Sequence, residues 1–523
     1  METWFIILIT ICISVILKSI FELLIPTKNP THKLPPGPPT IPILSNFLWL
    51  KRSGQEIESI LRDLTAKLGP MVTLRLGSQA AIFVSDRSLA HKALIHNGAV
   101  FAGRPEALPI TKIESSNQHT INTASYGPTW RVLRRNLTEK ILNPSRVKSY
   151  SHARKWVLDI LLNSLKSSDH LAAILVMEHF QYAMYSLLVL MCFGDKLEEK
   201  QIMEISSAQR RLLLNVDRFN ILNFFPMVTK IVFRKKWQEF YEMLQVQKDV
   251  LVPLIRERKK VKEGRLSKVK ENRGEEEKHE QVLCYVDTLL DLQLPEERRN
   301  LDEEEMVSLC AEFLDAGTDT TSTALQWIMA NLVKYPEIQE RLLTEMKGVM
   351  LMMKEEDALI IKEDDLQKMP YLRAVILEGL RRHPPAHFVL PHAVTEEDTI
   401  LDEFLVPKKN GTINFMVAEM GLDPKVWKDP MDFKPERFLK VNDHDQVFDI
   451  TGSREIKMMP FGAGRRICPA HALALLHLEY FVANLIWSFH WKAVDGDGVD
   501  LDEKQEFLIV MKNPLKVHLS PRF

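Results

Sequence analysis

The stretch that most constrains this chain is residues 460–470, Pro-Phe-Gly-Ala-Gly-Arg-Arg-Ile-Cys-Pro-Ala, which leads directly into an apolar segment. A cysteine in a glycine-rich loop at the start of a helix meets backbone N–H groups and the positive helix end, and both stabilise a thiolate. Cys468 is therefore a candidate metal ligand or nucleophile. Phe461 can lie against a cofactor, Gly464 allows a close backbone turn, and Arg466 can bind an anionic group.

Two other interpretations of this loop compete with a reactive cysteine. A lone intracellular cysteine is usually a small buried hydrophobic residue, and Gly462 with Gly464 begins a pattern like a dinucleotide-binding fingerprint. Ile467 occupies the place of the third glycine, and no strand–helix–strand unit with an acidic residue follows. The fingerprint is excluded, and the rest of the chain decides between a structural and a reactive cysteine.

Composition limits the class of protein. The chain has 523 residues, 46% of them hydrophobic and 26% charged, which suits a large globular protein. Lys and Arg number 68 against 69 Asp and Glu, so no excess of positive charge indicates nucleic acid as a partner. The 5 cysteines are scattered and form no CxxC pair. We expect reduced thiols in a cytosol-facing protein, without a disulfide framework or a zinc site.

The N-terminal segment, residues 1–25, includes an almost unbroken apolar run over 4–17. Counted to its end, the segment approaches the roughly 20 residues that cross a bilayer. A cleaved signal peptide is the alternative, but no basic segment precedes the run and no small-residue cleavage site follows it. Lys28 and Lys33 follow the segment whereas Glu2 precedes it, which places the rest of the chain in the cytosol. We therefore predict a single-pass membrane anchor.

Two local patterns follow the anchor. Residues 26–40 contain Leu-Pro-Pro-Gly-Pro-Pro at 34–39, which predicts a stiff hinge, because proline fixes φ and removes backbone donors. Residues 71–84 alternate, most clearly over 72–76, and are turned by Gly77 and Ser78, as a small β-hairpin would be.

Most of the remaining chain has helical spacing of its apolar residues, most clearly over 148–191 and 205–252. The densely charged segment 256–280 predicts an exposed connection. We therefore expect one mainly α catalytic domain over 41–523, with small sheet portions near both of its ends.

A second chemical motif lies in residues 303–335, a run that is long and apolar enough to cross the interior of a domain. Inside it, residues 316–321 read Ala-Gly-Thr-Asp-Thr-Thr, and local helix stability does not explain Gly317 or Thr320. A small residue followed by an acid and a hydroxyl, Asp319 and Thr320, suits a helix that approaches a cofactor and relays protons. A kink stabilised by bonds from side chains to the backbone is the alternative.

The third motif is the charged pair Glu378 and Arg381, three residues apart on a predicted helix that ends before two prolines. On a surface such a pair contributes only about 0.2–0.5 kcal/mol, but the apolar residues around it predict partial burial. A buried pair needs further partners, and Arg437 is a candidate. We expect these three residues to form a structural network and not to take part in catalysis.

Donors for a cofactor's anionic groups form the fourth set. Trp130 and Arg134 are one helical turn apart, so an indole N–H and a guanidinium share a face. His392 offers an imidazole after the helix that carries Glu378. Each of these residues alone is more often involved in packing or surface charge than in binding, so only their joint occurrence is informative.

These motifs, Trp-x-x-x-Arg, Ala-Gly-x-Asp-Thr-Thr, Glu-x-x-Arg and Phe-x-x-Gly-x-Arg-x-Cys, stand in the order typical of the cytochrome P-450 family. The chain resembles a microsomal cytochrome P-450 of the plant A-type clan, most of all its family eighty-nine. The resemblance implies a mainly α P-450 fold behind an N-terminal transmembrane helix, with haem b (iron protoporphyrin IX) ligated through Cys468. It also implies that Phe461 lies against the haem and that its propionates are held by Trp130, Arg134, His392 and Arg466.

The resemblance further implies that Asp319 and Thr320 deliver protons while O2 is activated, so that one oxygen atom enters a lipophilic small molecule. The chain has no flavin or nicotinamide fingerprint of its own. Electrons are therefore expected from NADPH through a separate NADPH–cytochrome P-450 reductase. The expected location is the endoplasmic reticulum membrane, with the catalytic domain in the cytosol. A basic docking face for the reductase is expected from Arg131, Arg135, Lys140 and Arg465.

Two other functions stay open. One is a haem-thiolate isomerase or dehydratase that needs no reductase, and the other is a non-enzymatic haem sensor. The pair Asp319 and Thr320 argues against both, because neither needs protons for oxygen activation. One residue departs from the family pattern, since Ala470 stands where glycine is usual. Its methyl group must fill a small gap or displace the helix, so we expect haem to be retained somewhat more loosely.

Overall fold

The structure is a computed structural model that describes Thr10 and residues 33–38, 53–76, 79–167, 173–271, 283–352, 359–439, 448–494 and 498–522. The predicted anchor, apart from Thr10, and both ends of the predicted hinge lie outside the described residues. The chain divides into two compact units. The first comprises Met1–Pro105 and Phe388–Met420, and the second comprises Glu106–His387 and Gly421–Phe523.

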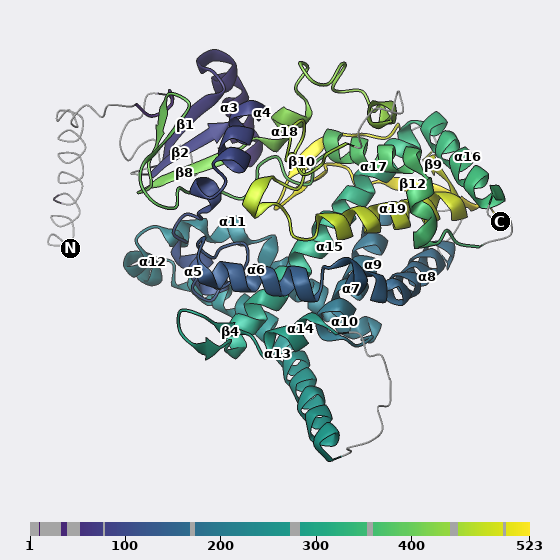
Figure 1. Ribbon diagram of the computed structural model, residues 1–523, viewed down its shortest axis with the longest axis horizontal. Coiled ribbons are helices and arrows are strands. Elements are labelled where there is room, and N and C mark those ends of the chain that lie inside the picture. The colour runs from purple at the N-terminus through teal and green to yellow at the C-terminus, as the bar shows by residue number, and fades with distance from the viewer. Residues whose placement is uncertain are drawn as a thin grey trace. The chain divides into compact units, whose positions relative to one another are not determined.

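The first unit contains a three-stranded sheet of order β1–β2–β8 (Figure 1). Strands β1 (Met71–Leu76) and β2 (Gln79–Val84) pair antiparallel, so the predicted hairpin is confirmed, although its turn at 77–78 lies outside the described residues. Strand β8 (Gly411–Phe415) pairs parallel to β2. Residues 71–74 of β1 and 80–82 of β2 are all buried, and successive side chains of a strand point to opposite faces, so both faces of the hairpin are covered here.

The helix α3 (Gly54–Leu68) packs on the same sheet, with Leu61 in one apolar cluster with Val72 and Leu74 of β1. Its first turn is closed by a capping box between Ser53 and Glu56. The other elements of this unit are α4 (Arg87–His91), the π-helix η1 (Lys92–His96), the 3-10 helix η2 (Val100–Ala102), β6 (Thr399–Leu401), β7 (Phe404–Val406) and α18 (Val417–Gly421).

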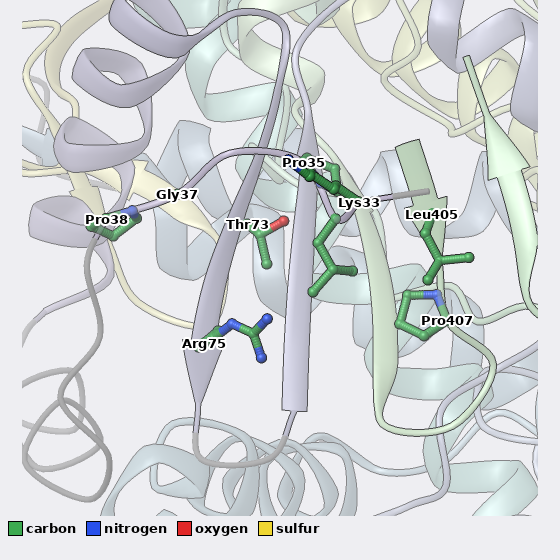
Figure 2. Close-up of a pocket in the computed structure, with 9 residues that line it drawn as sticks. Lys33, Pro35, Gly37, Pro38, Thr73, Arg75, Leu405 and Pro407 are labelled. Carbon is green, nitrogen blue, oxygen red and sulfur yellow. The ribbon is translucent and has the colours of Figure 1, made fainter. Parts of the chain in front are cut away.

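The described part of the hinge, residues 33–38, is attached to this unit by its backbone. The Thr73 N–H donates to the Pro36 carbonyl at 2.8 Å, and the Leu405 N–H donates to the Lys33 carbonyl at 3.0 Å. A cavity of about 550 Å³ lies beside this segment. Figure 2 shows Thr73 and Arg75 of β1 on one side of Lys33, and Leu405 and Pro407 on the other. The predicted haem-binding residues do not line this cavity.

The second unit is mainly helical and is built around α15 (Glu303–Lys334), which packs against α9 (Val176–Phe193), α17 (Pro370–Arg382) and α19 (His471–Ser488) (Figure 1). Every residue of α15 from 321 to 333 is buried. The predicted long internal helix is therefore confirmed, with its start at Glu303 and its end one residue before the predicted boundary.

The remaining elements of the second unit surround this core. Its other helices are α5 (Pro109–Glu114), α6 (Pro128–Lys140), α7 (Pro144–Ser149), α8 (Ser151–Ser167), α10 (Glu199–Leu213), α11 (Val216–Phe219), η3 (Asn220–Asn223), α12 (Pro226–Val232), α13 (Arg234–Glu271), α14 (Tyr285–Leu289), α16 (Pro336–Met352), η4 (Glu363–Lys368), η5 (Pro435–Phe438) and η6 (Gly464–Arg466). Its strands form a sheet of order β3–β12–β9 and two hairpins: β3 (Ile174–Leu175), β12 (Lys516–Pro521), β9 (Phe489–Ala493), β4 (Gln293–Leu294), β5 (Arg299–Asn300), β10 (Glu503–Gln505) and β11 (Ile509–Met511).

The charged segment 256–280 is predicted to be an exposed connection, and most of its side chains over 256–264 are exposed, but its backbone is helical as far as residue 271. Helix α13 continues through it as far as residue 271, and Figure 1 shows α13 extending beyond the neighbouring helices. Lys, Arg and Glu are good helix formers, so their charge does not end the helix. Arg258 is also buried, and it donates two hydrogen bonds to the Asp287 carboxylate at 2.8 and 2.6 Å.

Among the described residues, α9 is the one helix that is long and apolar enough to cross a membrane, and 72% of it is buried inside the protein. Its extensive packing against α15 makes it a core helix of the second unit. The four described cysteines, Cys192, Cys284, Cys310 and Cys468, are free thiols.

Candidate active site

Cys468 lies in a tight loop between η6 and α19. Gly462 and Gly464 have φ values of +69° and +70°, in the left-handed region that favours glycine, which explains the glycine pattern of the loop. The Cys468 N–H donates to the Phe461 carbonyl at 2.8 Å and closes the loop. Ala470 is the residue immediately before α19, so the cysteine lies at the N-terminal end of that helix.

The environment of the thiol has two opposing effects. Burial raises the pKa of Cys468 above its ordinary value, whereas the Ala470 N–H and the charge of Arg134 lower it. Burial has the larger effect on this pKa. A metal cation coordinated by the sulfur would oppose the effect of burial, because such a cation deprotonates a thiol outright.

Trp130 and Arg134 of α6 share one face, as predicted from their spacing, and this face lies beside the cysteine loop. Arg134 donates to the Ile467 carbonyl at 2.5 Å. The guanidinium carbons of Arg134 and Arg466 lie 5.9 and 4.5 Å from the centre of the Trp130 ring. The Trp130 Nε1–H is buried and has no hydrogen-bond partner in the described part of the chain. Two arginines beside an unsatisfied buried N–H form a site for an anion that accepts hydrogen bonds.

Phe461 and His392 are the other two predicted haem-binding residues. Phe461 is half-buried, and its ring centre lies 6.3 Å from that of His471. His392 belongs to the first unit, where its Nδ1–H donates to the Phe101 carbonyl at 2.7 Å. This bond fixes the tautomer of the imidazole. The role of His392 at a haem propionate stays a prediction.

Helix α15 is continuous through the predicted proton-relay motif. The Thr320 hydroxyl donates to the Ala316 carbonyl at 2.6 Å, while the hydroxyls of Thr318 and Ser322 bond in the same way to the carbonyls four residues earlier, at 2.7 and 2.8 Å. The side-chain to backbone bonds of the alternative interpretation are thus present. They engage the proton of Thr320 Oγ1 and leave its lone pairs to accept a hydrogen bond.

Gly317 lies where α15 packs closely on α9. A Cβ added at this position would lie 2.7 Å from Cδ1 of Leu188 on α9. The close packing of α9 on α15 therefore accounts for the glycine. The approach of α15 to a cofactor at this point stays a prediction.

Asp319 is buried and is held by two residues that the motif does not contain. Its Oδ1 accepts from Gln181 of α9 at 3.1 Å and forms an ion pair with Arg210 of α10. Its Oδ2 is buried without a partner among the described residues. Burial raises the pKa of Asp319, and the charge of Arg210 and the Gln181 hydrogen bond only partly oppose this effect. Arg210 and Gln181 carry no signal in the sequence, since neither lies in a recognisable motif.

Two further acids belong to this region: Asp315 lies near Asp319, and Glu114 lies near Asp315. Asp315 is one turn earlier on α15, and burial together with the charge of Asp319 raises its pKa well above the ordinary value. Burial raises the pKa of Glu114, at the end of α5, to about 7. Oδ1 of Asp315 and Oε1 of Glu114 have no partner in the described part of the chain. The sequence gives no indication of this group, because the two acids lie far apart along it.

The predicted structural network is assembled in the second unit. Both carboxylate oxygens of Glu378 accept from Arg381 at 2.7 Å, and Arg437 Nε donates to Glu378 at 3.2 Å. The side chains of Glu378 and Arg381 are fully buried. Arg381 also donates to the carbonyls of Gly421 and Pro430 at 2.9 and 2.8 Å. These bonds supply the further partners that a buried ion pair needs.

Comparisons with known proteins agree over the length of the chain. A profile of the family described as cytochrome P-450 matches residues 35–519. The chain is 51% identical to cytochrome P-450 89A9 of Arabidopsis thaliana, over 99% of this chain and 98% of that protein. It is 29% identical to 5-epiaristolochene 1,3-dihydroxylase of Nicotiana tabacum, over 95% of this chain and 94% of that protein. A zebra fish cytochrome P-450 solved with progesterone is similar in fold, with a TM-score of 0.70 at 21% identity, over 89% of this chain and 99% of that chain.

Proposed function

Because the chain belongs to the cytochrome P-450 family, we propose that it is a haem-thiolate monooxygenase in which Cys468 is the proximal ligand. The family, the mainly α P-450 fold and the likeness to family eighty-nine, all predicted from the sequence, are confirmed. Haem is the cofactor, and the protein is a cytochrome P-450 monooxygenase. When bound, the haem iron activates O2, of which one atom enters the substrate and the other leaves as water.

We place the haem here mainly because the N–H of Trp130 is buried and has no hydrogen-bond partner in the described part of the chain. A buried donor without a partner is costly, and a carboxylate acceptor removes that cost. Arg134 and Arg466 lie beside the same ring and supply positive charge. These residues fit a haem propionate, with Cys468 of the adjoining loop as the ligand to iron.

Asp319 and Thr320 are proposed to hold and move protons. Burial raises the pKa of Asp319 and so favours the protonated form of its carboxyl group, and the bonds to Oδ1 leave Oδ2 as the atom that carries the proton. Thr320 Oγ1 donates to the Ala316 carbonyl, so it accepts a hydrogen bond from a proton carrier on its other side. Arg210 then orients Asp319 without being part of the relay.

A separate NADPH–cytochrome P-450 reductase is the proposed electron donor. Exposed basic side chains lie on and next to α6, near the cysteine loop, and complement an acidic partner. The guanidinium carbons of Arg131 and Arg465 lie 5.1 and 5.8 Å from the centre of the Tyr126 ring, which groups them on one surface. Arg135 and Lys140 are exposed on the same helix.

The proposed location is the endoplasmic reticulum membrane, with an anchor at 1–25, a hinge at 26–40 and a cytosolic catalytic domain at 41–523. Helix α12 supports contact with a membrane, because Met227 and Ile231 are each 81% exposed. Arg234 and the basic residues next to it are exposed beside this apolar surface. Apolar side chains flanked by basic ones are typical of a helix that lies on an anionic lipid surface.

The proposed substrate is a lipophilic small molecule. The relative from Nicotiana tabacum is a 5-epiaristolochene 1,3-dihydroxylase, and it aligns with 95% of this chain. Hydroxylation of such a molecule needs the cofactor, protons and electron donor proposed here, and no nucleic acid.

The ligand assignment is tested by the spectrum of the reduced protein with carbon monoxide. Thiolate ligation gives a strongly red-shifted Soret band, which Cys468→Ser should abolish. Cys310→Ser is the matched control, because this buried thiol lies in the core of the second unit and should leave the band in place. Survival of the band in Cys468→Ser would contradict the assignment.

A further inference from the structure

We infer that Glu312 is a positioning residue for haem: its carboxylate holds the loop 114–124 where Arg466 is directed at a propionate. The inference rests on the proposed function, because it requires haem beside Arg466 and Trp130. Glu312 lies on α15, outside the sequence motifs that carry the haem chemistry.

The loop 114–124 is held along one stripe of α15, at Glu305, Ser308 and Glu312. Their spacing of three and four residues places these side chains on one helix face. Oε1 of Glu305 lies 2.6 Å from Nδ1 of His119, and the Ser308 hydroxyl donates to the Glu114 carbonyl at 2.9 Å. The stripe thus attaches the loop at its start and middle, and Glu312 attaches its end.

The contact of Glu312 is with the backbone. One carboxylate oxygen accepts from the Ile121 N–H at 2.9 Å, and the other accepts from the Asn122 N–H at 2.6 Å. A carboxylate that accepts from two consecutive amides forms charge-assisted hydrogen bonds, which are stronger than neutral ones. Ile121 is only 6% exposed, so water does not readily replace the carboxylate at its N–H.

Ile121, whose N–H is bound by Glu312, also contacts Arg466 through its carbonyl. The two Nη atoms of Arg466 donate to the Ile121 carbonyl at 3.2 Å and to the Ala124 carbonyl at 2.7 Å. Glu312 therefore binds the N–H of Ile121 while Arg466 binds its C=O. The guanidinium of Arg466 is fixed between these carbonyls and the Trp130 ring. If Ile121 shifts, the guanidinium of Arg466 turns with it and no longer points at the same place beside the Trp130 ring.

The loop needs this support because its conformation is strained. Ser116, Asn117 and Gln118 have consecutive positive φ values of 45°, 60° and 66°. Backbone of this kind persists only where the surrounding structure determines it. Loss of the Glu312 contact should therefore let the loop relax, rather than leave two unpaired N–H donors, those of Ile121 and Asn122, in an unchanged structure.

The first experiment compares haem loss in purified holoprotein. Glu312→Gln and Glu312→Ala should transfer haem to excess apomyoglobin faster than the wild type, by about tenfold in the alanine variant, which corresponds to about 1.4 kcal/mol. Glutamine keeps one acceptor, so its effect should be smaller. Glu304→Gln is the control, because Glu304 lies on the same helix but pairs with Lys248 at the surface. Haem loss from Glu312→Ala at the wild-type rate would overturn the inference.

A spectroscopic readout separates positioning from general stability. The propionate bending bands in the resonance Raman spectrum report the hydrogen bonds that the propionates accept. These bands should shift in both Glu312 variants. In the control variant, neither the bands nor the melting temperature should change. Unshifted bands in a variant that loses haem quickly would show a structural effect alone and would contradict the inference. The carbon monoxide band of the wild type tests the proposed function independently, since it does not depend on Glu312.

A measurement on the wild-type holoprotein covers the case in which the variants do not fold. Amide hydrogen exchange of a peptide across residues 119–124 should show strong protection at Ile121 and Asn122, because both N–H groups are bonded to Glu312. Exchange at the rate of an open loop would overturn the inference without any substitution.

Discussion

The guanidinium carbon of Arg466 lies 4.5 Å from the centre of the Trp130 ring, whose Nε1–H is buried without a partner in the described part of the chain. The ring has two separate roles in this arrangement. Its face supports the arginine through a cation–π contact, and its edge presents a donor to an acceptor. A haem propionate beside both groups would satisfy the N–H and the positive charge together.

Trp130→Phe separates these two roles, because phenylalanine keeps an aromatic face but has no N–H. We expect haem to bind and then dissociate faster by about 10-fold to 150-fold, the equivalent of the roughly 1.5–3 kcal/mol of one hydrogen bond to a charged group. The measurement is haem transfer to apomyoglobin. Trp156→Phe is the control. The Nζ of Lys196 lies 4.7 Å from the centre of the Trp156 ring, so this tryptophan also makes a cation–π contact, but elsewhere in the second unit. Equal haem loss in Trp130→Phe and wild type would show that the indole N–H has another partner.

Thr320→Ala should keep its haem but use electrons inefficiently. Removal of the hydroxyl that accepts a proton should lower productive oxygenation by about tenfold or more and divert reducing equivalents to hydrogen peroxide. The measurement is peroxide formed per NADPH oxidised with added reductase. Ser322→Ala is the matched control, because Ser322 forms the same bond to the carbonyl four residues earlier but is fully buried. Unchanged coupling in Thr320→Ala would mean that protons arrive by another route.

The stability of the protein should fall between pH 6.5 and pH 4 because of His383. This histidine stacks on Trp327, with ring centres 4.1 Å apart. Burial lowers its pKa to about 4, and the hydrogen bond and charge of Glu503 only partly oppose the effect, while the charges of Arg382 and His387 add to it. The unfolded chain binds a proton near pH 6.5 and the folded protein does not until about pH 4, so acid favours unfolding by up to about 3 kcal/mol.

Melting temperatures measured across this pH range test the effect. His383→Gln should flatten the pH dependence, although it lowers stability at neutral pH by removing the stacked ring. His152→Gln, at an exposed position on α8, should leave the wild-type slope unchanged. A slope of the same size in His383→Gln and wild type would assign the pH dependence to other groups.

Ala470→Gly tests the departure from the family pattern. Ala470 has φ −97° and ψ 14°, an ordinary conformation for any L-residue, so the backbone itself does not require glycine. Its methyl group packs against the core of the second unit, and glycine is also preferred to alanine at the residue before a helix. We expect the variant to lose haem more slowly, by roughly twofold to fivefold, which corresponds to less than 1 kcal/mol. Equal or faster loss would show that the methyl group fits without strain.

The sequence by itself determined the features that depend on neighbouring residues. Gly462 and Gly464 could be assigned to a tight turn because only glycine adopts a left-handed backbone without cost, and both do so. The helix over residues 303–334 and the hairpin of β1 and β2 followed from the spacing of apolar residues, which directly reflects which face is buried. Trp130 and Arg134 share a face because they are one helical turn apart.

Only the tertiary structure decided the partners of these residues. Arg210 reaches Asp319 across 109 positions of the sequence, and Glu312 reaches Ile121 across 191. Gly317 was explained by Leu188 on another helix, and the charged end of α13 was helical partly because Arg258 is buried against Asp287. Local propensity contains no information about which distant side chain fills a gap or satisfies a charge. That choice is made when the helices pack and water is excluded, because a buried polar group must then be paired within the protein.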